Sequence, residues 1–224
     1  ANCTATASGS VTVNSTPTAL VTPSTQSICN GQNATLTASG GTSYLWSTTA
    51  TTAAITVSPT STTTYTVTVT NASNCSATAS GSVTVNALPT AQVTPSSQSI
   101  CNGQNATLTA SGGTSYVWNT SASTAAITVN PTTTTTYTVT VTNANSCSAT
   151  ASGSVTVNSL PTAQVNPSTQ TICNGQSATL TASGGTSYLW NTTATTAAIT
   201  VSPSANTTYT VTVTNAANCS ATAS

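Results

Sequence analysis

Cysteines are the residues of this chain best equipped for chemistry, because Asp, Glu, His, Lys and Arg are all absent. Thiols without imidazole or carboxylate neighbours are suited to oxidation into disulfides. A zinc site is disfavoured, because two cysteines in each repeat of the sequence cannot fill four coordination positions. Free buried thiols are the remaining alternative. The seven cysteines form two series with a constant spacing of 72 residues, namely Cys3, Cys75, Cys147 and Cys219, and Cys29, Cys101 and Cys173.

The spacing of the two series favours pairing within a repeat. Each such bond would close a loop of about 46 residues and contribute roughly 4 kcal/mol in the chain-entropy model. Disulfides repeated along a polar chain indicate an oxidising, extracellular compartment. The predicted disulfides are Cys29–Cys75, Cys101–Cys147 and Cys173–Cys219, with Cys3 bonded to a preceding repeat.

The absence of charge excludes several classes of function, since an ordinary globular chain has about a quarter charged residues. Acid–base catalysis near neutral pH needs a tunable imidazole, carboxylate or amine, and phosphate or nucleic-acid binding needs Lys and Arg. The chain also has no apolar run of about 18 residues, so membrane insertion is not expected. We therefore expect neither an enzyme nor a cofactor, metal or nucleic-acid partner.

Self-similarity at the same interval of 72 residues predicts an array of small domains. Residues 1–14 match the end of a repeat and are expected to be the last strand of a preceding one. They are followed by repeats at 15–86, 87–158 and 159–224, the third lacking the end of its last strand. This arrangement favours a segment cut from a longer array, and the alternative is a chain that lends its first strand to a neighbour.

Short alternating segments within each repeat predict an all-β fold. In residues 106–111 small apolar residues alternate with Thr and Ser, and residues 136–142 alternate in the same way. Asn102-Gly103 is typical of a tight turn, and Gly153 suggests a bend or bulge in the last strand. Six or seven short strands with frequent turns predict a β-sandwich. The expected aromatic core residues are Trp46, Trp118, Trp190, Tyr65, Tyr137 and Tyr209.

The same segments carry a resemblance to the immunoglobulin (Ig) fold. It implies tandem Ig-like β-sandwich modules in which Ala110 and Val139 take the usual inter-sheet cysteine positions and pack on Trp118. It also implies that Tyr137 is the tyrosine-corner residue. The chain departs from the family because its cysteines lie in loops. The matching segments are ATLTASG (106–112), Tyr116, Trp118 and TYTVTV (136–141).

A narrower resemblance covers all the repeats. The series ICNGQ, LTASGGTSYLW, TTYTVTVTN and CSATAS is similar to the Ig-like and PKD-like repeats of very large Bacteroidetes surface proteins. Members of that group are adhesins and filament proteins, generally exported by type IX secretion. The resemblance therefore implies an extracellular location at the cell surface or in a secreted filament.

These observations favour a structural segment of an adhesin, stalk or filament. Short linkers containing Pro would make the array stiff, and uncharged edge strands would favour lateral self-association. A ligand-binding surface module for carbohydrate, or less plausibly ice, is the alternative. The ice hypothesis depends on the alternate threonines of Thr64–Thr70, which are spaced about 6.7 Å apart along a strand.

Overall fold

The computed structural model describes residues 1–224, which form strands and turns without any helix. No helix long and apolar enough to cross a bilayer is present. Residues 1–19 form no strand, and every side chain from residue 1 to residue 16 is exposed. The strands that follow build pairs of sheets around separate apolar cores.

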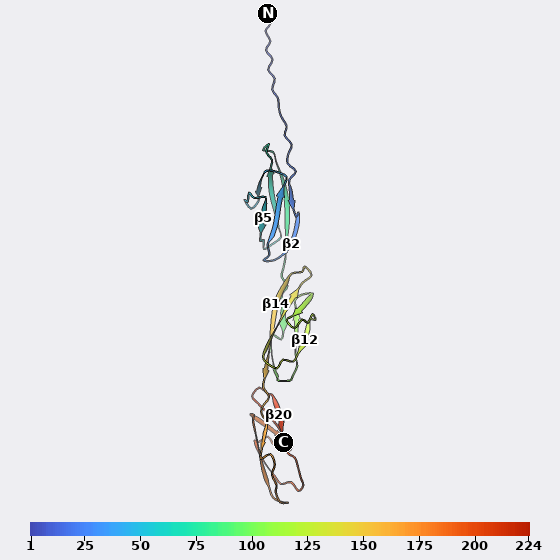
Figure 1. Cartoon of the computed structure of the whole chain (residues 1–224), viewed down its shortest axis with the longest axis vertical. Coiled ribbons are helices and arrows are strands. Elements are labelled where there is room, and N and C mark those ends of the chain that lie inside the picture. Colours follow the sequence, from blue (N-terminus) through green and yellow to red (C-terminus); the bar gives the residue numbers. More distant parts are fainter. The chain divides into compact units, whose positions relative to one another are not determined.

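The first sandwich packs a three-stranded sheet, ordered β1-β3-β5, against a four-stranded sheet, ordered β2-β7-β6-β4. Figure 1 labels one strand of each sheet, β5 and β2. In β3 the side chains of Ala34, Leu36 and Ala38 are buried, while the intervening Thr and Ser are exposed, as a half-buried strand requires. The strands are β1 (Leu20–Thr22), β2 (Thr25–Cys29), β3 (Ala34–Ser39), β4 (Ser43–Trp46), β5 (Ala54–Val57), β6 (Thr63–Thr70) and β7 (Ser76–Asn86).

The second sandwich repeats this arrangement, with one sheet ordered β8-β10-β12 and the other β9-β14-β13-β11. The pairing of β9 with the last strand, β14, is parallel, as is the pairing of β2 with β7 in the first sandwich. The strands are β8 (Gln92–Thr94), β9 (Ser97–Cys101), β10 (Ala106–Ser111), β11 (Ser115–Trp118), β12 (Ala126–Val129), β13 (Thr135–Thr142) and β14 (Ser148–Asn158).

The third sandwich has two three-stranded sheets, ordered β15-β16-β18 and β17-β19-β20. It has no counterpart of β2, because residues 169–173 form no strand. Its last strand is also shorter than β7 and β14. The strands are β15 (Gln164–Asn166), β16 (Ala178–Ser183), β17 (Ser187–Trp190), β18 (Ala198–Val201), β19 (Val211–Thr214) and β20 (Ser220–Ala223).

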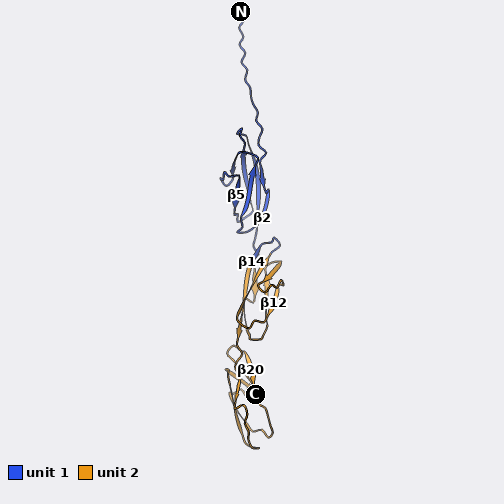
Figure 2. Cartoon of the chain, viewed as in Figure 1, with its two compact units in different colours: residues 1–89, 143–148 blue, residues 90–142, 149–224 orange.

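The chain is therefore all-β, made of tandem Ig-like sandwiches with an antiparallel three-stranded sheet facing a sheet that carries the last two strands. By contact density it divides into two compact units (Figure 2), namely residues 1–89 with 143–148, and residues 90–142 with 149–224. The boundaries expected from the period, 15–86, 87–158 and 159–224, stay a prediction. We use them below as names for the first, second and third repeats.

Two expectations about the strands need correction. Gly153 lies inside the continuous strand β14 instead of marking a bulge. A Cβ atom there would lie 2.7 Å from Cγ1 of Val93, so glycine is required by close packing. The tyrosine-corner hydrogen bond is also not made by Tyr137. The hydroxyl of Tyr116 instead donates a 2.9 Å hydrogen bond to the Gly113 carbonyl.

The tryptophans lie at the centre of each core. Trp46 and Trp118 are 2% exposed and Trp190 is 1% exposed. The indole nitrogen of Trp46 donates to the Thr52 carbonyl at 2.9 Å, which satisfies its buried N–H. Trp118 lies opposite Val139 across β11 and β13, and Ala110 belongs to the same buried cluster.

Candidate functional site

The structure contains two disulfides, and each joins one repeat to the next. Cys29 is bonded to Cys147, and Cys101 is bonded to Cys219. Both pairs are separated by 118 residues in the sequence, with Cα–Cα distances of 5.6 Å and 5.5 Å, which are usual for disulfides. Residues 143–148 accordingly fall in the same compact unit as the first repeat, although they follow β13 in the sequence (Figure 2).

The predicted pairing within repeats, Cys29–Cys75, Cys101–Cys147 and Cys173–Cys219, is therefore wrong. The reason is the length of the last strand. Cys29 ends β2 opposite Asn86, at the far end of β7, whereas Cys75 directly precedes Ser76 at the start of β7. The 11 residues of β7 span roughly 33 Å at about 3.3 Å per residue, far beyond the reach of a disulfide.

An asparagine positions each loop cysteine beside the linker that enters its own repeat. The Asn143 side-chain oxygen accepts from the Cys147 backbone N–H at 3.1 Å, and its amide nitrogen donates to the Ala87 carbonyl at 2.9 Å. Ala87 follows Asn86, which lies opposite Cys29 in the parallel pair of β2 and β7. Cys147 is thus brought to the end of the first repeat where Cys29 lies, and the bond closes there.

The same arrangement occurs at the other two loop cysteines. Asn215 accepts from the Cys219 N–H at 3.0 Å and donates to the Ser159 carbonyl at 2.8 Å. Asn71 accepts from the Cys75 N–H at 3.0 Å and donates to the Ser15 carbonyl at 2.9 Å. Sequence reasoning missed these asparagines. The available signal was that each precedes a cysteine by four residues at the 72-residue interval.

Three cysteines carry no disulfide: Cys3, Cys75 and Cys173. Cys3 and Cys173 are exposed, while Cys75 is half-buried, and its thiol contacts the Asn14 carbonyl at 3.8 Å. In both disulfides the earlier cysteine belongs to the series Cys29, Cys101 and Cys173, and the later one belongs to the other series. A step of 118 residues in that sense, forward from Cys173 or backward from Cys3 and Cys75, falls outside residues 1–224. The bonding of Cys3 to a preceding repeat remains a prediction.

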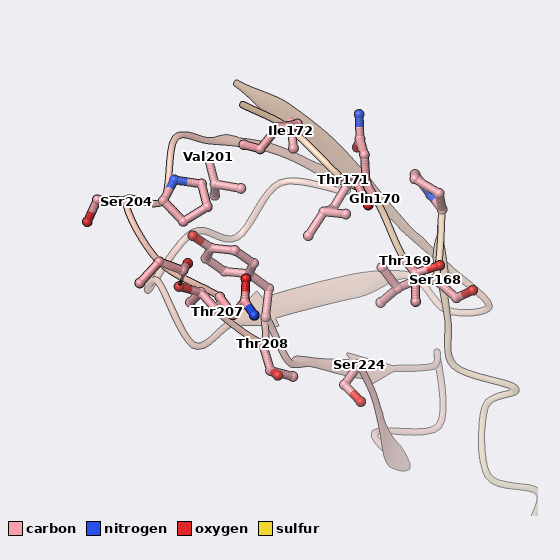
Figure 3. A pocket seen from close by; sticks show the side chains of 18 of the residues that line it. Ser168, Thr169, Gln170, Thr171, Ile172, Val201, Ser204, Thr207, Thr208 and Ser224 are labelled. Carbon is pink, nitrogen blue, oxygen red and sulfur yellow. Dashed lines mark hydrogen bonds between the residues drawn. The ribbon is translucent and has the colours of Figure 1, made fainter. Parts of the chain in front are cut away.

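The third repeat contains an open groove where the other two have the end of their last strand. In the first two repeats the sequence GSVTVN, at 81–86 and 153–158, completes β7 and β14, whereas the sequence ends at Ser224, one residue before the counterpart of Gly81. The groove has a volume of about 430 Å³. Figure 3 shows Ser168 to Ile172 on one side of it, Thr207 and Thr208 on the other, and Ser224 at one end.

The open groove changes the burial of the residues around it. Ile172, Leu180 and Tyr209 are only half-buried, although their counterparts in the first repeat are 5%, 0% and 9% exposed. Tyr209 was expected to be buried in the core like Tyr65 and Tyr137, but it is only half-buried because no strand covers it. The residues 207–210 also leave the sheet, so β19 has four residues where β6 has eight.

The chemistry available at these sites is thiol–disulfide exchange and backbone pairing. No group of three or more metal-ligating side chains is present. The tryptophans and tyrosines of the cores are bonded to backbone carbonyls or packed among apolar side chains. The groups left free for this chemistry lie at the strand edges and at the cysteines without a disulfide.

Comparisons with known proteins identify no family. No family model matches the sequence, and no curated protein matches it. Among solved structures, the four N-terminal Ig domains of Dscam1 isoform 1.9 match at 19% identity and a TM-score of 0.28, over 66% of this chain and 47% of that one. The eight N-terminal Ig domains of DSCAM isoform 1.30.30 match at 13% identity and a TM-score of 0.29, over 94% and 41%.

A third similar structure comes from a virus. The three N-terminal domains of the bacteriophage RB49 Highly Immunogenic Outer Capsid protein match at 20% identity and a TM-score of 0.33, over 78% of this chain and 74% of that one. The chain spans less than half the length of the Dscam structures that it matches. TM-scores of this size carry no argument, so the Ig-like assignment rests on the strand order of each sandwich. The chain is an array of Ig-like β-sandwiches.

Proposed function

We propose that this chain is a structural repeat segment of an extracellular adhesin, stalk or filament. The observation that carries the proposal is the covalent link between successive repeats, Cys29–Cys147 and Cys101–Cys219. A linker of three residues such as Ala87–Pro89 would by itself permit hinge motion. A disulfide beside each linker adds a second connection and restrains that hinge, which is useful in a part that must transmit force or hold a distance.

The proposed compartment follows from the same bonds. Disulfides persist in oxidising surroundings outside the cytosol. The resemblance to Bacteroidetes surface repeats supports a cell-surface or secreted location, with export by type IX secretion as the finer proposal. The absence of charged residues also removes the cleavage sites of proteases that require Lys, Arg, Asp or Glu, which suits a durable external material. The proposal assigns no catalytic activity.

Lateral self-association is part of the proposal. Strand β4 is the edge of its sheet, and Leu45 on it is 55% exposed, while Val117 and Leu189 take the equivalent positions with 58% and 53% exposure. These edge strands carry neither the Lys nor the Pro that commonly prevents edge-to-edge pairing. An uncharged surface also lacks the repulsion that keeps chains apart. One apolar edge in each repeat therefore supports bundling of chains side by side.

The alternative of a ligand-binding module receives less support. Carbohydrate recognition commonly uses exposed aromatic rings, and every tryptophan here is at most 2% exposed. In the expected ice-binding ladder, Thr64 and Thr66 are exposed but Thr68 and Thr70 are half-buried. Neither the buried tryptophans nor the partly buried threonines form a flat, exposed platform for a ligand, so the structural role is the better supported one.

Small-angle X-ray scattering on dilute, oxidised protein tests the stalk proposal. Each repeat should span roughly 33 Å, from the 11 residues of β7 at about 3.3 Å per residue. We expect the native chain and the control variant Cys173→Ser to scatter as one stiff, extended particle. The double variant Cys29→Ser/Cys101→Ser should show a broad distribution of shorter maximum dimensions. A native chain as variable as the double variant, or a compact one, would contradict the proposal.

A further inference from the structure

We propose that the turn after β2, together with its counterparts in the other repeats, is a site of spontaneous asparagine deamidation. The turn contains Asn30-Gly31, and the same pair recurs as Asn102-Gly103 and Asn174-Gly175. Each pair lies in a turn outside the strands. The reaction needs only the chain itself and water, and it gives negative charge to a chain whose side chains carry none.

Hydrogen bonds on either side of the asparagine and the glycine close the turn of the first repeat. The Gln32 backbone N–H donates to the Cys29 carbonyl at 3.0 Å, and the Gln32 side chain accepts from the Cys29 N–H at 3.0 Å. The Asn30 N–H donates to the Asn86 carbonyl at 2.9 Å, which ties the turn to the end of β7. Gly31 has a φ of +88°, a conformation that glycine adopts without strain.

The second repeat has the same turn at Asn102-Gly103. The Gln104 backbone N–H donates to the Cys101 carbonyl at 3.0 Å, and the Gln104 side chain accepts from the Cys101 N–H at 3.1 Å. The Asn102 N–H donates to the Asn158 carbonyl at 2.9 Å. Gly103 has a φ of +87°. The geometry of the turn is therefore repeated along with its sequence.

The peptide group between the asparagine and the glycine makes no hydrogen bond in either turn. The Asn30 carbonyl and the Gly31 N–H have no partner in the protein, nor do the Asn102 carbonyl and the Gly103 N–H. Nothing lies within 4 Å of a Cβ atom built on either glycine, and both asparagines are exposed. The peptide group can therefore rotate without breaking a hydrogen bond, which lets the glycine nitrogen approach the side-chain carbonyl carbon of the asparagine.

The reaction begins when a base from the solvent removes the proton of the Gly31 N–H. The nitrogen attacks Cγ of Asn30 and forms a C–N bond there, and the side-chain nitrogen leaves as ammonia after taking up a proton from water. Water then adds to one of the two carbonyl carbons of the resulting succinimide and opens the ring. The product is aspartate, or isoaspartate where the chain continues through Cγ, and either carries one negative charge near neutral pH.

Two nearby asparagines lack these features and provide an internal comparison. Asn33 and Asn105 are also exposed, but each is followed by an alanine that begins a strand, β3 or β10, and that has a Cβ atom to crowd the attacking nitrogen. Their side chains are also held. The Asn33 oxygen accepts from the Ser58 hydroxyl at 2.5 Å, and the Asn105 oxygen accepts from the Asn130 amide at 2.9 Å. The structure therefore predicts that these two asparagines are protected.

Deamidation changes both the charge and the backbone beside the disulfides. The chain contains no Asp, Glu, Lys, Arg or His, so each new carboxylate is the only charged side chain of its repeat. It directly follows Cys29 or Cys101, each of which is bonded to the next repeat. Isoaspartate also lengthens the backbone of the turn by a methylene group, which loosens the hydrogen bonds of Gln32 and Gln104 to these cysteines. The reaction does not depend on the structural role proposed above.

The experiment incubates three forms of the oxidised 224-residue chain, with the free thiols blocked by a neutral alkylating reagent. They are the native chain, the variant Asn30→Gln/Asn102→Gln/Asn174→Gln, and the matched control Asn33→Gln/Asn105→Gln. Glutamine keeps the amide, but its longer side chain must close a larger and less favourable ring. On ion-exchange chromatography the native chain and the control should resolve into species with up to three added negative charges, one for each Asn–Gly pair. The triple variant should gain charge roughly tenfold more slowly or less.

Peptide mapping by mass spectrometry locates the modified asparagines, and a methyltransferase specific for isoaspartate identifies the isomer. In the native chain Asn30 and Asn102 should convert roughly tenfold faster or more than Asn33 and Asn105. The rate should rise with pH, because the attack needs a deprotonated N–H and the chain has no acidic or basic side chain to take the proton. The proposal is overturned by a native chain whose charge stays unchanged after prolonged incubation, by equal rates at the two pairs of asparagines, or by a triple variant that gains charge as fast as the native chain.

Discussion

Pulling the chain by its two ends should reveal the overlapping disulfides directly. In the oxidised chain the shortest covalent path runs through residues 1–29, crosses to Cys147, returns to Cys101, crosses to Cys219 and ends at residue 224. Residues 30–100 and 148–218 are bypassed. The path contains roughly 80 residues, so the fully extended length is about 270 Å at about 3.4 Å per residue. The reduced chain of 224 residues should reach about 760 Å.

Single substitutions make the measurement specific for the pairing. Cys101→Ser opens one bond, and the path becomes residues 1–29 and 147–224, which extends to about 360 Å. Cys173→Ser removes a cysteine that forms no bond, so its extended length should equal that of the native chain. Pairing within repeats would instead give Cys173→Ser a gain of about 150 Å.

The assay is single-molecule force spectroscopy on protein tethered through thiol-free handles, with and without reductant. We expect a stepwise gain in length for Cys101→Ser and none for Cys173→Ser in oxidising buffer. Reduction should bring every form to the same final length. A Cys173→Ser chain that lengthens before reduction would refute the cross-repeat pairing.

Three further predictions concern stability, each measured as the free energy of unfolding by denaturant titration. Gly81→Ala should destabilise its repeat by about 1–3 kcal/mol, because the new Cβ atom would lie 2.7 Å from Val21. The control Gly9→Ala should change the free energy of unfolding by less than about 0.5 kcal/mol, and equal effects of the two substitutions would contradict the packing described. Asn143→Ala should lower the free energy of unfolding by about 1–3 kcal/mol, because its hydrogen bonds to Cys147 and Ala87 are lost. Asn145→Ala is the control and should have no effect. An equally small effect of Asn143→Ala would show that Asn143 does not position Cys147. Unfolding free energy should stay constant from about pH 4 to 7, because no Asp, Glu or His is present to bind protons differently in the folded and unfolded states; a steep acid transition would show otherwise.

The strands and the cores could be predicted from the sequence because the alternation of residue types and the repeat interval indicate the same elements. Alternation of small apolar residues with Thr and Ser predicted strands such as β3 and β10, and the recurring tryptophans predicted one core in each repeat. Local periodicity reports which face of a strand is buried, so it needs no knowledge of distant partners. These elements predicted a β-sandwich, and the Ig-like class came from the resemblance that the same segments carry.

The disulfide pairing could not be read in the same way. A separation of 46 residues and one of 118 recur equally well at the 72-residue interval, so the period does not choose between them. The choice depends on Gly81 lying within an unbroken β7, which carries Asn86 away from Cys75. Expecting a bend at Gly153, the counterpart of Gly81, removed the one indication of the length of the strand.

The open groove was predicted only in part. The period predicted that the third repeat, 159–224, lacks the end of its last strand, but it did not predict that residues 169–173 and 207–210 would then form no strand. Residues 169–173 have the same strand-forming composition as Thr25–Cys29, yet they form no strand, because their only partner in the sheet is absent. Strand formation at that position depends on a contact far away in the sequence.

Disulfide mapping on the monomeric, oxidised chain tests the central claim most directly. Chymotrypsin cleaves after Tyr, Trp and Leu but not before Pro, so Cys29, Cys101, Cys147 and Cys219 fall in four different peptides without reducing agent, and mass spectrometry then identifies the linked peptides. Cross-linked repeats predict peptides joining Cys29 to Cys147 and Cys101 to Cys219, with Cys173 recovered as a free thiol. Recovery of Cys101 linked to Cys147 would contradict the account.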